Sequence, residues 1–225
     1  MNAQTLSVDQ KTMNQTGLPE AVNDRLSLYY PFLKDWETIG YKTVTCENIG
    51  SDLHLEPSRV MEDLESIGII SSPRIGYVLC NVIYELELFF GWNKVNQGII
   101  VGAGSIGSAL LGYGKFEQCG LKIVAAFDLD ESKIGGCIHG KAVYPLEKLV
   151  EFVQLGDIDI GVVAVPATEA QIVADLLVEG GIRAIWNFSP VHLEVPESTI
   201  VQNQDLYCSL ATLSKKLKAS TESVP

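Results

Sequence analysis

The sequence predicts an α/β protein, with a small helical domain at the N-terminus, a doubly wound parallel sheet after it and one helix at the C-terminus. From residue 97 onward, short apolar runs alternate with segments of helical period, the order that builds a parallel sheet covered on both faces. Ahead of it, three helical segments precede two short apolar stretches that flank a Ser-Ser-Pro turn. The 225 residues are 47% hydrophobic, which is enough for a sizeable core.

The N-terminal domain, expected at residues 18–92, has the pattern of a winged helix. Residues 1–17 are polar and are expected to form a disordered tail. Closely spaced second and third helices are typical of a helix-turn-helix, and a hairpin after them is typical of a wing. A plain helical bundle is the alternative. The expected elements are a helix at 19–40, short helices at 45–53 and 57–68, a β-hairpin at 69–78 and a linking helix at 79–91.

The second domain, expected at residues 93–204, alternates strands with helices. Its strands are near-continuous apolar runs, which is typical of a parallel sheet with both faces buried. This alternation predicts a doubly wound fold. The expected strands are 98–101, 122–127, 143–144, 158–165, 183–187 and 200–201, and the expected helices are 105–119, 146–154 and 168–179.

The turn after the first of these strands carries the spacing G-x-G-x-x-G. In dinucleotide sites the first glycine allows a sharp turn, the second lets the backbone approach a pyrophosphate, and the third lets the helix pack on the strand. The pyrophosphate then meets backbone N–H groups at a helix N-terminus. A tight turn without a ligand is the alternative. The sequence predicts a Rossmann-type site at Gly102, Ala103, Gly104, Ser105, Ile106 and Gly107.

Asp128 ends the next strand, 21 positions after Gly107, and predicts the cofactor. A carboxylate at this place accepts hydrogen bonds from the ribose 2′- and 3′-hydroxyls and repels a 2′-phosphate. The first basic residue after it is Lys133, and Asp130 is a second candidate for the same role. NAD(H) is therefore expected rather than NADP(H).

Composition disfavours several classes of protein. A net charge of −12 opposes nucleic-acid binding unless positive charge gathers in one place. Five cysteines form no C-x-x-C pair and three histidines lie far apart, so no disulfide framework or metal site is expected, and each cysteine is expected to be a small buried hydrophobe. The N-terminus lacks a signal-peptide pattern and no apolar run reaches membrane-spanning length, so a cytoplasmic location without a membrane partner is expected.

The last helix, expected at residues 205–217 ahead of a tail at 218–225, carries an apolar stripe. Its leucines recur at spacings of four, three and four residues. Because little chain follows the sheet, this stripe is expected to be a dimer contact rather than to pack within the chain. The stripe consists of Leu206, Leu210, Leu213 and Leu217.

These features together resemble the Rex family of redox-sensing transcriptional repressors over roughly residues 18–217. Several of the matching strings are unusual in combination, which makes the resemblance specific. Besides the glycine turn, the strings are RLSLYY at 25–30, DL at 63–64, GY at 76–77, AAFD at 125–128, KIG at 133–135, AVPA at 164–167, NFSP at 187–190, VPE at 195–197 and DL at 205–206.

The resemblance implies a homodimer that exchanges its C-terminal helix between subunits and senses the ratio of NADH to NAD⁺. Members of the family bind operator DNA when NADH is scarce and release it when NADH binds. The resemblance also implies a state-dependent network, which by position consists of Arg25, Tyr113 and Asp205. Without the resemblance, Arg25 and Asp205 would be interpreted as solvated surface charges of little energetic weight.

Two further segments end strands at the C-terminal edge of the sheet, where open α/β folds bind their ligands. Asn187 and Phe188 begin one segment and are the candidates for the nicotinamide side of the site. Turn residues with ordinary packing are the alternative. The other segment consists of Val165, Pro166 and Ala167.

The DNA-reading part departs from the family. The expected recognition helix, residues 56–67, holds one arginine against four acidic residues, and residues 1–92 hold six Lys and Arg against thirteen Asp and Glu. The family has arginine and lysine where Met61 and Glu62 stand. Because neutralisation of phosphates supplies most non-specific affinity for DNA, the binding expected is weak. The expected DNA contacts are Arg59 and Arg74.

The function expected is an NADH/NAD⁺-responsive repressor of the Rex type. The main alternative is a paralogue that keeps the NAD(H) sensor but binds a protein partner, or forms mixed dimers, through its acidic winged helix. A Rossmann enzyme is disfavoured because there is no separate substrate domain and no Tyr-x-x-x-Lys motif. A coenzyme A-binding relative is a minor alternative, and such a protein would not need Asp128.

Overall fold

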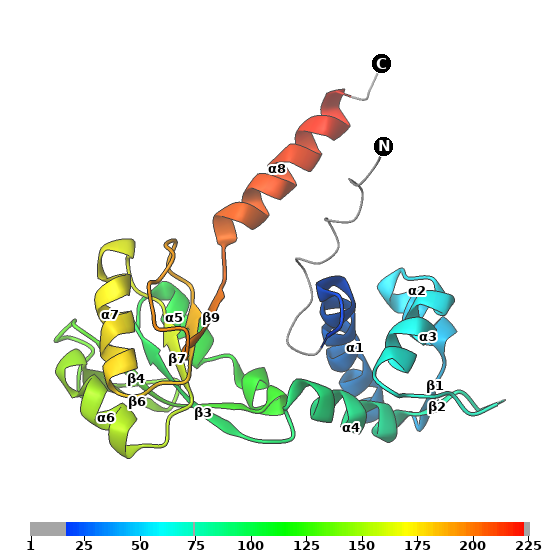
Figure 1. The fold of residues 1–225 in the computed structure, drawn as a ribbon, viewed down its shortest axis with the longest axis horizontal. Coiled ribbons are helices and arrows are strands. Elements are labelled where there is room, and N and C mark those ends of the chain that lie inside the picture. The colour runs from blue at the N-terminus through cyan, green and yellow to red at the C-terminus, as the bar shows by residue number, and fades with distance from the viewer. Residues whose placement is uncertain (1–16, 74, 223–225) are drawn as a thin grey trace, which may run out of the picture. The chain divides into compact units, whose positions relative to one another are not determined.

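The computed structural model describes residues 17–73 and 75–222. The chain divides into two units, Met1–Asn93 and Lys94–Pro225, and each is described by itself. Arg74 and the predicted tail, apart from Gly17, lie outside the described residues. Figure 1 shows the helical N-terminal unit and the sheet of the second unit.

The described part of the N-terminal unit consists of four helices and a small antiparallel pair of strands. Local sequence sets its boundaries: Thr45 caps the second helix through a reciprocal capping box with Asn48, Pro57 opens the third, and Gly40 ends the first with φ of 103°. The elements are α1 (Glu20–Ile39), β1 (Thr43–Val44), α2 (Cys46–Leu53), α3 (Pro57–Ser66), β2 (Tyr77–Val78) and α4 (Leu79–Phe90).

The wing differs from the predicted hairpin. Ile69 and Ile70 form no strand, and β2 pairs instead with β1, with Val44 opposite Tyr77. A single bridge between Ser72 and Gly76 closes the turn of the wing. A side chain at Gly76 would lie 2.5 Å from the carbonyl oxygen of Val44, so close approach to β1 requires glycine. The prediction was wrong here because the partner strand is only two residues long and leaves no periodic signal.

The second unit is built on a seven-stranded sheet in the order β5-β6-β4-β3-β7-β8-β9. All neighbouring strands are parallel except β5 and β6, and the six strands from β6 to β9 have the Rossmann order. The strands are β3 (Asn96–Val101), β4 (Leu121–Asp128), β5 (Cys137–Ile138), β6 (Lys141–Pro145), β7 (Ile160–Val163), β8 (Ala184–Asn187) and β9 (Ile200–Asn203).

Helices cover both faces of this sheet, and alternate side chains of β3 enter two separate cores. Ile99 and Val101 belong to one core and Ile100 to the other. This alternation explains why the strand reads as a continuous apolar run. The helical elements are α5 (Ser105–Leu111), the 3₁₀ segments η2 (Gly114–Cys119) and η3 (Leu146–Lys148), α6 (Leu149–Leu155), α7 (Ala167–Glu179) and α8 (Leu206–Glu222).

Three predicted boundaries in this unit need correction. The helix expected at 105–119 ends at Leu111, because Gly112 and Gly114 interrupt it before the 3₁₀ segment η2. The strand expected at 158–165 is limited to Ile160–Val163. The last helix continues past its expected end at residue 217 to Glu222.

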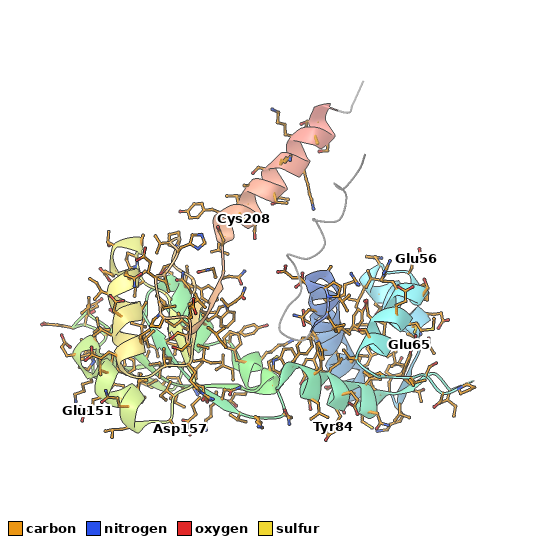
Figure 2. All side chains as sticks on the ribbon, viewed as in Figure 1. Glu56, Glu65, Tyr84, Glu151, Asp157 and Cys208 are labelled. Carbon is orange, nitrogen blue, oxygen red and sulfur yellow. The ribbon has the colours of Figure 1, made fainter. Side chains whose placement is uncertain are left out.

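The apolar stripe of α8 is present and uncovered. Its four leucines, at positions 206, 210, 213 and 217, are between 55% and 65% exposed. The prediction that all five cysteines are buried was wrong, since three are exposed and two are half-buried; Figure 2 shows one of the exposed ones, Cys208, on α8. Nowhere in 17–73 or 75–222 do three or more metal-ligating side chains gather.

No helix in the described part of the chain is both long enough and apolar enough to cross a membrane.

Candidate functional site

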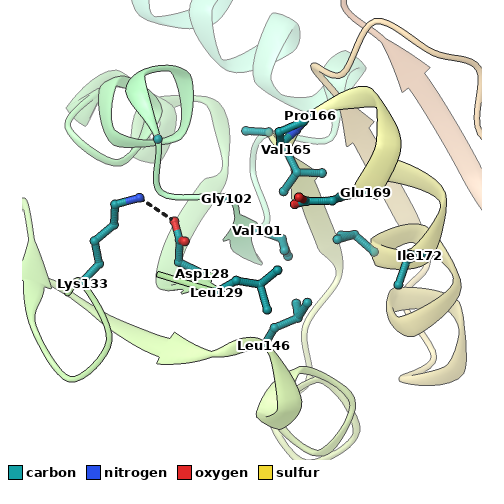
Figure 3. A pocket seen from close by; sticks show the side chains of 13 residues that line it. Val101, Gly102, Asp128, Leu129, Lys133, Leu146, Val165, Pro166, Glu169 and Ile172 are labelled. Atoms are coloured by element: carbon teal, nitrogen blue, oxygen red, sulfur yellow. Dashed lines mark hydrogen bonds and ion pairs between the residues drawn. The ribbon is translucent and has the colours of Figure 1, made fainter. Parts of the chain in front are cut away.

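The predicted site lies at the carboxyl ends of β3 and β7, which are neighbours in the sheet. The chain continues from these strands into α5 and α7, so the order of strands reverses here and opens a crevice, as in other open α/β sheets. A cavity of about 230 Å³ occupies the crevice. Gly102, Asp128 and Val165 line it, together with Lys133 and Glu169, as Figure 3 shows.

The three glycines of the turn have three different surroundings. Gly102 has φ of 96°, and a side chain there would lie 2.5 Å from the carbonyl oxygen of Ala164 on the neighbouring segment. A side chain at Gly107 would collide with the carbonyl oxygen of Gly102, so the helix packs on the turn without any space between them. Gly104 has nothing within 4 Å of the position of a side chain. The second glycine therefore faces open space that a ligand can enter, as the dinucleotide prediction requires.

Asp128 is held firmly at the end of β4. Its Oδ2 accepts from the backbone N–H of Ala103 at 2.8 Å and from Lys133 Nζ at 3.1 Å, and its Oδ1 accepts from the N–H of Asp130 at 2.9 Å. Burial raises the pKa of Asp128, but these three donors together outweigh burial and the pKa ends below its ordinary value. The carboxylate is therefore charged at neutral pH and fixed beside the glycine turn.

Lys133, the first basic residue after Asp128, also lines the cavity, and its role beside Asp128 was not predicted. Its ammonium lies 3.1 Å from Asp128 and 3.4 Å from Asp130, and these carboxylates raise its pKa. The residue reaches back because the turn after β4 brings the two side chains together. Lys133 offsets part of the negative charge with which Asp128 would repel a 2′-phosphate.

The opposite wall of the cavity is apolar and was not predicted. Leu129, Leu146 and Ile172 line it, with Val173 behind them. The carboxylate of Glu169, on the first turn of α7, points into the cavity (Figure 3). A flat apolar group such as a purine suits this wall.

A second cavity, of about 320 Å³, lies between the segment after β8 and the start of α8. It brings together three residues with separately predicted roles: Ile106 of the glycine turn, Phe188 of the nicotinamide side and Asp205 of the switch network. Asp205 also accepts a hydrogen bond from the N–H of Cys208 at 2.9 Å and so caps α8. Phe188 thus shares a cavity with Ile106, which directly follows the start of α5, and its contact with the nicotinamide stays a prediction.

Asn187 has a different role from the predicted nicotinamide contact. Its side chain is fully buried, and its amide donates to the carbonyl of Val191 at 2.8 Å and to Asn203 Oδ1 at 2.9 Å. Its Oδ1 accepts from the N–H of Ser189 at 3.0 Å. Because both amide hydrogens and the oxygen are in use, Asn187 holds the loop that presents Phe188 and offers no free donor to a ligand.

Tyr113 begins a chain of aromatic contacts that ends at Phe188. Its ring centroid lies 4.8 Å from Phe116, which lies 5.5 Å from Trp186, which in turn lies 4.8 Å from Phe188. Tyr113 itself is 53% exposed. These ring contacts connect Tyr113, which was predicted to belong to the switch network, with Phe188, which was predicted to bind the ligand.

Arg25 has a partner that was not predicted. Its Nε and Nη2 donate to the two oxygens of Asp63 at 2.7 and 2.6 Å, within the N-terminal unit. The alternative of a solvated surface charge is therefore wrong for Arg25, and the network with Tyr113 and Asp205 that the resemblance implies stays a prediction.

Arg59 lies on the exposed face of α3, and an acidic neighbour neutralises it. Its Nη1 is 3.0 Å from Glu62 Oε2, and both side chains are more than half exposed. Glu56, directly ahead of the helix, and Glu65, on its last turn, are exposed as well; both are labelled in Figure 2. The described part of this helix therefore presents no unpaired basic side chain to DNA, and the other predicted contact, Arg74, lies outside the described residues.

Comparison with known proteins agrees with this geometry. Residues 93–191 match a family model described as a CoA binding domain. A redox-sensing transcriptional repressor Rex from Bacteroides thetaiotaomicron is 35% identical over 90% of this chain and 92% of its own length. One from Treponema denticola is 39% identical over 84% of this chain and 90% of its own.

The chain belongs to the Rex family of redox-sensing transcriptional repressors. This membership confirms the predicted family, and it confirms that the chain is a transcription regulator rather than an enzyme.

Solved structures of a Rex-family repressor, RSP, confirm the predicted fold class. RSP in complex with β-NAD⁺ and operator DNA matches with a TM-score of 0.81 at 31% identity, over 91% of this chain and 94% of that chain. RSP in complex with β-NADH matches with a TM-score of 0.78 at the same identity, over 91% and 96% of the two chains. The winged helix, the Rossmann-type sheet and the last helix thus belong to one architecture.

Proposed function

We propose that this chain is an NADH-responsive transcriptional repressor that binds operator DNA and releases it when NADH binds. The single observation that carries the proposal is the crevice in which Gly104 faces open space while Asp128 is held, ionised, beside it. The Rex-family structure RSP is described with β-NAD⁺ and operator DNA in one complex and with β-NADH in another. A protein that binds these ligands unequally in two states converts the redox ratio into DNA affinity.

The residues present fit a dinucleotide. The backbone at Gly104 leaves room for a pyrophosphate, Asp128 is placed to accept from the adenosine ribose, and the apolar wall around Leu146 suits the adenine. Phe188 and Ile106 line the second cavity, at the nicotinamide end. When bound, the cofactor supplies a difference of one positive charge at its nicotinamide ring between the oxidised and reduced forms.

Coenzyme A fits the crevice less well, although the matched domain model bears its name. Coenzyme A carries a 3′-phosphate on its adenosine ribose, at the place where the Asp128 carboxylate lies. Two anions in contact there repel each other, and Lys133 offsets only part of that repulsion because it already shares its charge with Asp130. We therefore assign NAD(H) to the site.

Two further features support a switch between subunits. The exposed leucines of α8 require a partner surface, and a second copy of the chain provides the matching stripe. Tyr113 and Asp205 are both exposed, and Asp205 lines the second cavity. We expect these two side chains to change partners between the two states. We expect Asp205→Ala to bind NADH normally and to remain on DNA when NADH is added.

DNA binding is the part of the function for which this chain departs most from its relatives. Glu62 and Glu65 are exposed on α3 and Glu56 is exposed directly ahead of it, whereas Arg59 is the one basic residue of this helix. This acidic surface favours a second candidate function, in which the winged helix binds a basic protein segment instead of DNA. A cytoplasmic location also stays a prediction.

The decisive experiment measures fluorescence anisotropy of a labelled duplex carrying a Rex operator, with the full-length protein at several salt concentrations. We expect binding with a shallow salt dependence, loss of binding when NADH is added, and retention when NAD⁺ is added. A matched control is Gly104→Ala, which should bind DNA but not respond to NADH. Absence of binding even at low salt, with NADH affinity intact, would favour the protein-partner function.

A further inference from the structure

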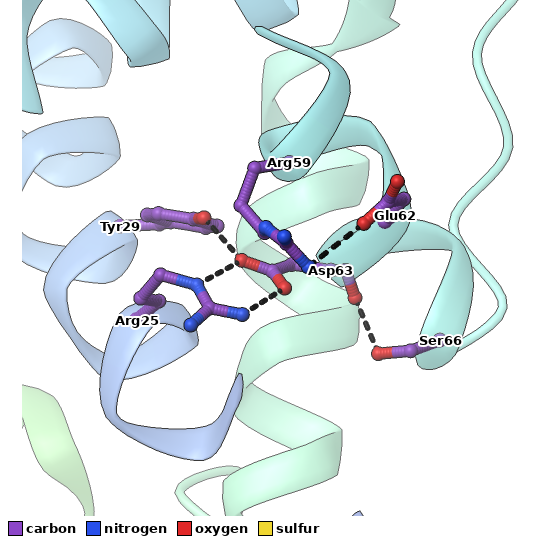
Figure 4. Close-up of polar contacts among 6 residues, drawn as sticks. All are labelled: Arg25, Tyr29, Arg59, Glu62, Asp63 and Ser66. Atoms are coloured by element: carbon purple, nitrogen blue, oxygen red, sulfur yellow. Dashed lines mark hydrogen bonds and ion pairs between the residues drawn. The ribbon is translucent and has the colours of Figure 1, made fainter. Parts of the chain in front are cut away.

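The recognition helix α3 holds one of its carboxylates in the protein interior. The side chain of Asp63 is 2% exposed. Its Oδ2 accepts from Arg25 Nε at 2.7 Å and from the Tyr29 hydroxyl at 2.6 Å, and its Oδ1 accepts from Arg25 Nη2 at 2.6 Å. Figure 4 shows these three hydrogen bonds converging on one carboxylate. A buried charge is thereby paired and fully hydrogen-bonded.

The two donors come from a single face of α1. Arg25 and Tyr29 are four residues apart, so they lie one turn above each other on that helix. The guanidinium is a planar fork, and a carboxylate that meets both of its prongs has little freedom to rotate. Burial and the carboxylate raise the pKa of Tyr29, and Asp63 raises the pKa of Arg25. Tyr29 therefore stays protonated and Arg25 stays charged across the physiological range.

Apolar packing alone would fix α3 less tightly. Val60 and Leu64 are fully buried on the same side of the helix as Asp63. Contacts between apolar side chains are not directional and tolerate a small rotation, whereas hydrogen bonds weaken steeply with misalignment. The charged cluster therefore selects one rotation of α3 among those that the apolar contacts permit.

That rotation decides which side chains α3 presents outward. Met61 and Glu62 directly precede Asp63 and are exposed, Met61 by 40%. Glu62 forms an ion pair with Arg59 at the surface, whereas Asp63, the next residue, binds Arg25 and Tyr29 in the interior (Figure 4). A turn of the helix about its axis would move Arg59 and Met61 together.

We infer that Asp63 is a positioning residue for the DNA-reading surface, acting through a clamp formed with Arg25 and Tyr29. The clamp fixes α3 on α1 and thereby fixes the direction of Arg59 and Met61, although Asp63 itself is buried and cannot touch DNA. This inference rests on the proposed function for its DNA readout. The clamp itself is a property of the N-terminal unit and has a readout without DNA.

The test uses the full-length protein and four variants. Asp63→Asn keeps the shape but loses the charge, Arg25→Lys keeps the charge but loses the planar fork, and Tyr29→Phe removes one hydrogen bond. Glu62→Gln is the matched control, because it removes a carboxylate from the outer face of the same helix. Operator affinity, NADH affinity and hydrogen exchange of the α3 amides are measured for each.

We expect Asp63→Asn and Arg25→Lys each to weaken operator binding at least tenfold, and Tyr29→Phe by about threefold, with NADH affinity within twofold of wild type. Hydrogen exchange should rise in α3 and not in the second unit. Glu62→Gln should do the opposite and strengthen operator binding, because it frees Arg59 and removes a negative charge. Arg25→Lys keeps a positive charge opposite Asp63, so it still tests the clamp where Asp63→Asn fails to fold.

The two possible failures are distinguishable. A wild-type protein that ignores operator DNA overturns the proposed function, and hydrogen exchange then still decides on the clamp. Folded Asp63→Asn and Arg25→Lys proteins with wild-type exchange in α3 overturn the clamp. Wild-type operator affinity in both variants, together with a wild-type protein that does bind, overturns it as well.

Discussion

The crevice of the second unit and the exposed face of α3 show opposite relations between sequence and task. In the crevice, a side chain at Gly102 or Gly107 would collide with the backbone. Gly104 faces open space, and it is the glycine that a pyrophosphate would approach. On α3, the surface expected to meet DNA is acidic, and its described arginine is already paired. The sensor has all the groups that its ligand needs, whereas the DNA-reading surface has little electrostatic attraction for DNA.

This difference teaches where affinity must come from. A ligand site gains from a few fixed groups, so one carboxylate and one open glycine suffice. DNA affinity comes mostly from the neutralisation of several phosphates by basic side chains. A face with more acidic than basic side chains therefore gains little affinity in this way. The position of each remaining side chain on α3 then matters more, which is why a buried clamp behind the helix has a large effect.

The largest expected effects separate the glycines from one another. Gly107→Ala should destabilise the second unit by about 1–3 kcal/mol, because its side chain would meet the backbone of Gly102.

Gly104→Ala should leave Tm unchanged, because φ of −76° suits alanine. It should lower NADH affinity by about 100-fold, about 2.7 kcal/mol, because the added side chain enters the space of the ligand. Thermal unfolding and calorimetric NADH titration measure both. Equal changes in Tm and in NADH affinity in the two variants would contradict a pyrophosphate site at Gly104.

The next effect concerns Asp128. Asp128→Ala should weaken NADH binding by about tenfold or more, since the ribose hydroxyls lose their acceptor. Its pKa is lowered in the folded protein, so the carboxylate stays charged as pH falls through the ordinary range of an aspartate. NADH affinity and the contribution of Asp128 to stability should therefore be constant above that range and be lost only as pH falls through the lowered pKa. Titration of NADH at a series of pH values checks this, and a loss beginning near pH 6 would count against it.

A charge reversal on α3 tests the contribution of the DNA-reading surface in the same way. Glu62→Lys should strengthen operator binding and steepen its salt dependence, by about one unit of log–log slope for each additional phosphate that is neutralised. NADH affinity should not move. Anisotropy titrations over a range of salt concentrations measure the slope, with Glu151→Lys, a substitution on α6 of the second unit, as the control for net charge. An identical slope in both variants would mean that this face does not meet DNA.

The smallest expected effect is at Lys133. Lys133→Met should lower NADH affinity by about two- to fivefold, because Asp128 loses one of three groups that orient it. It should lower affinity for NADPH by more, since the cation that offsets the repulsion of a 2′-phosphate is gone. Parallel titrations with both cofactors give the ratio. A rise in NADPH affinity would contradict the assigned role.

The sequence predicted the architecture well because its signals are local. Apolar runs, Gly102 through Gly107 and Asp128 each report a strand, a turn or a strand end without knowledge of distant contacts. The strand pairing of the wing was predicted wrongly because β1, its partner strand, is too short to leave a pattern. The helix predicted at 105–119 was too long because leucine and phenylalanine side chains continue a helical period across Gly112 and Gly114.

What the sequence could not supply was the pairing of charges. Arg25 and Asp63 are 38 positions apart, and Asp63 sits among exposed acids of the same helix. Its burial depends on how α3 packs on α1. Likewise, Asn187 stands at a place typical of ligand contacts, and only the hydrogen bonds to Val191 and Asn203 reveal that its amide is in use.

A crystal structure of the full chain grown with NADH tests the central claim most directly. The account predicts one dinucleotide per chain, with the pyrophosphate against the backbone at Gly104, the adenosine ribose on Asp128, the adenine against Leu146 and the nicotinamide near Phe188. A structure in which protein side chains fill this crevice, or in which NADH binds elsewhere, would contradict it.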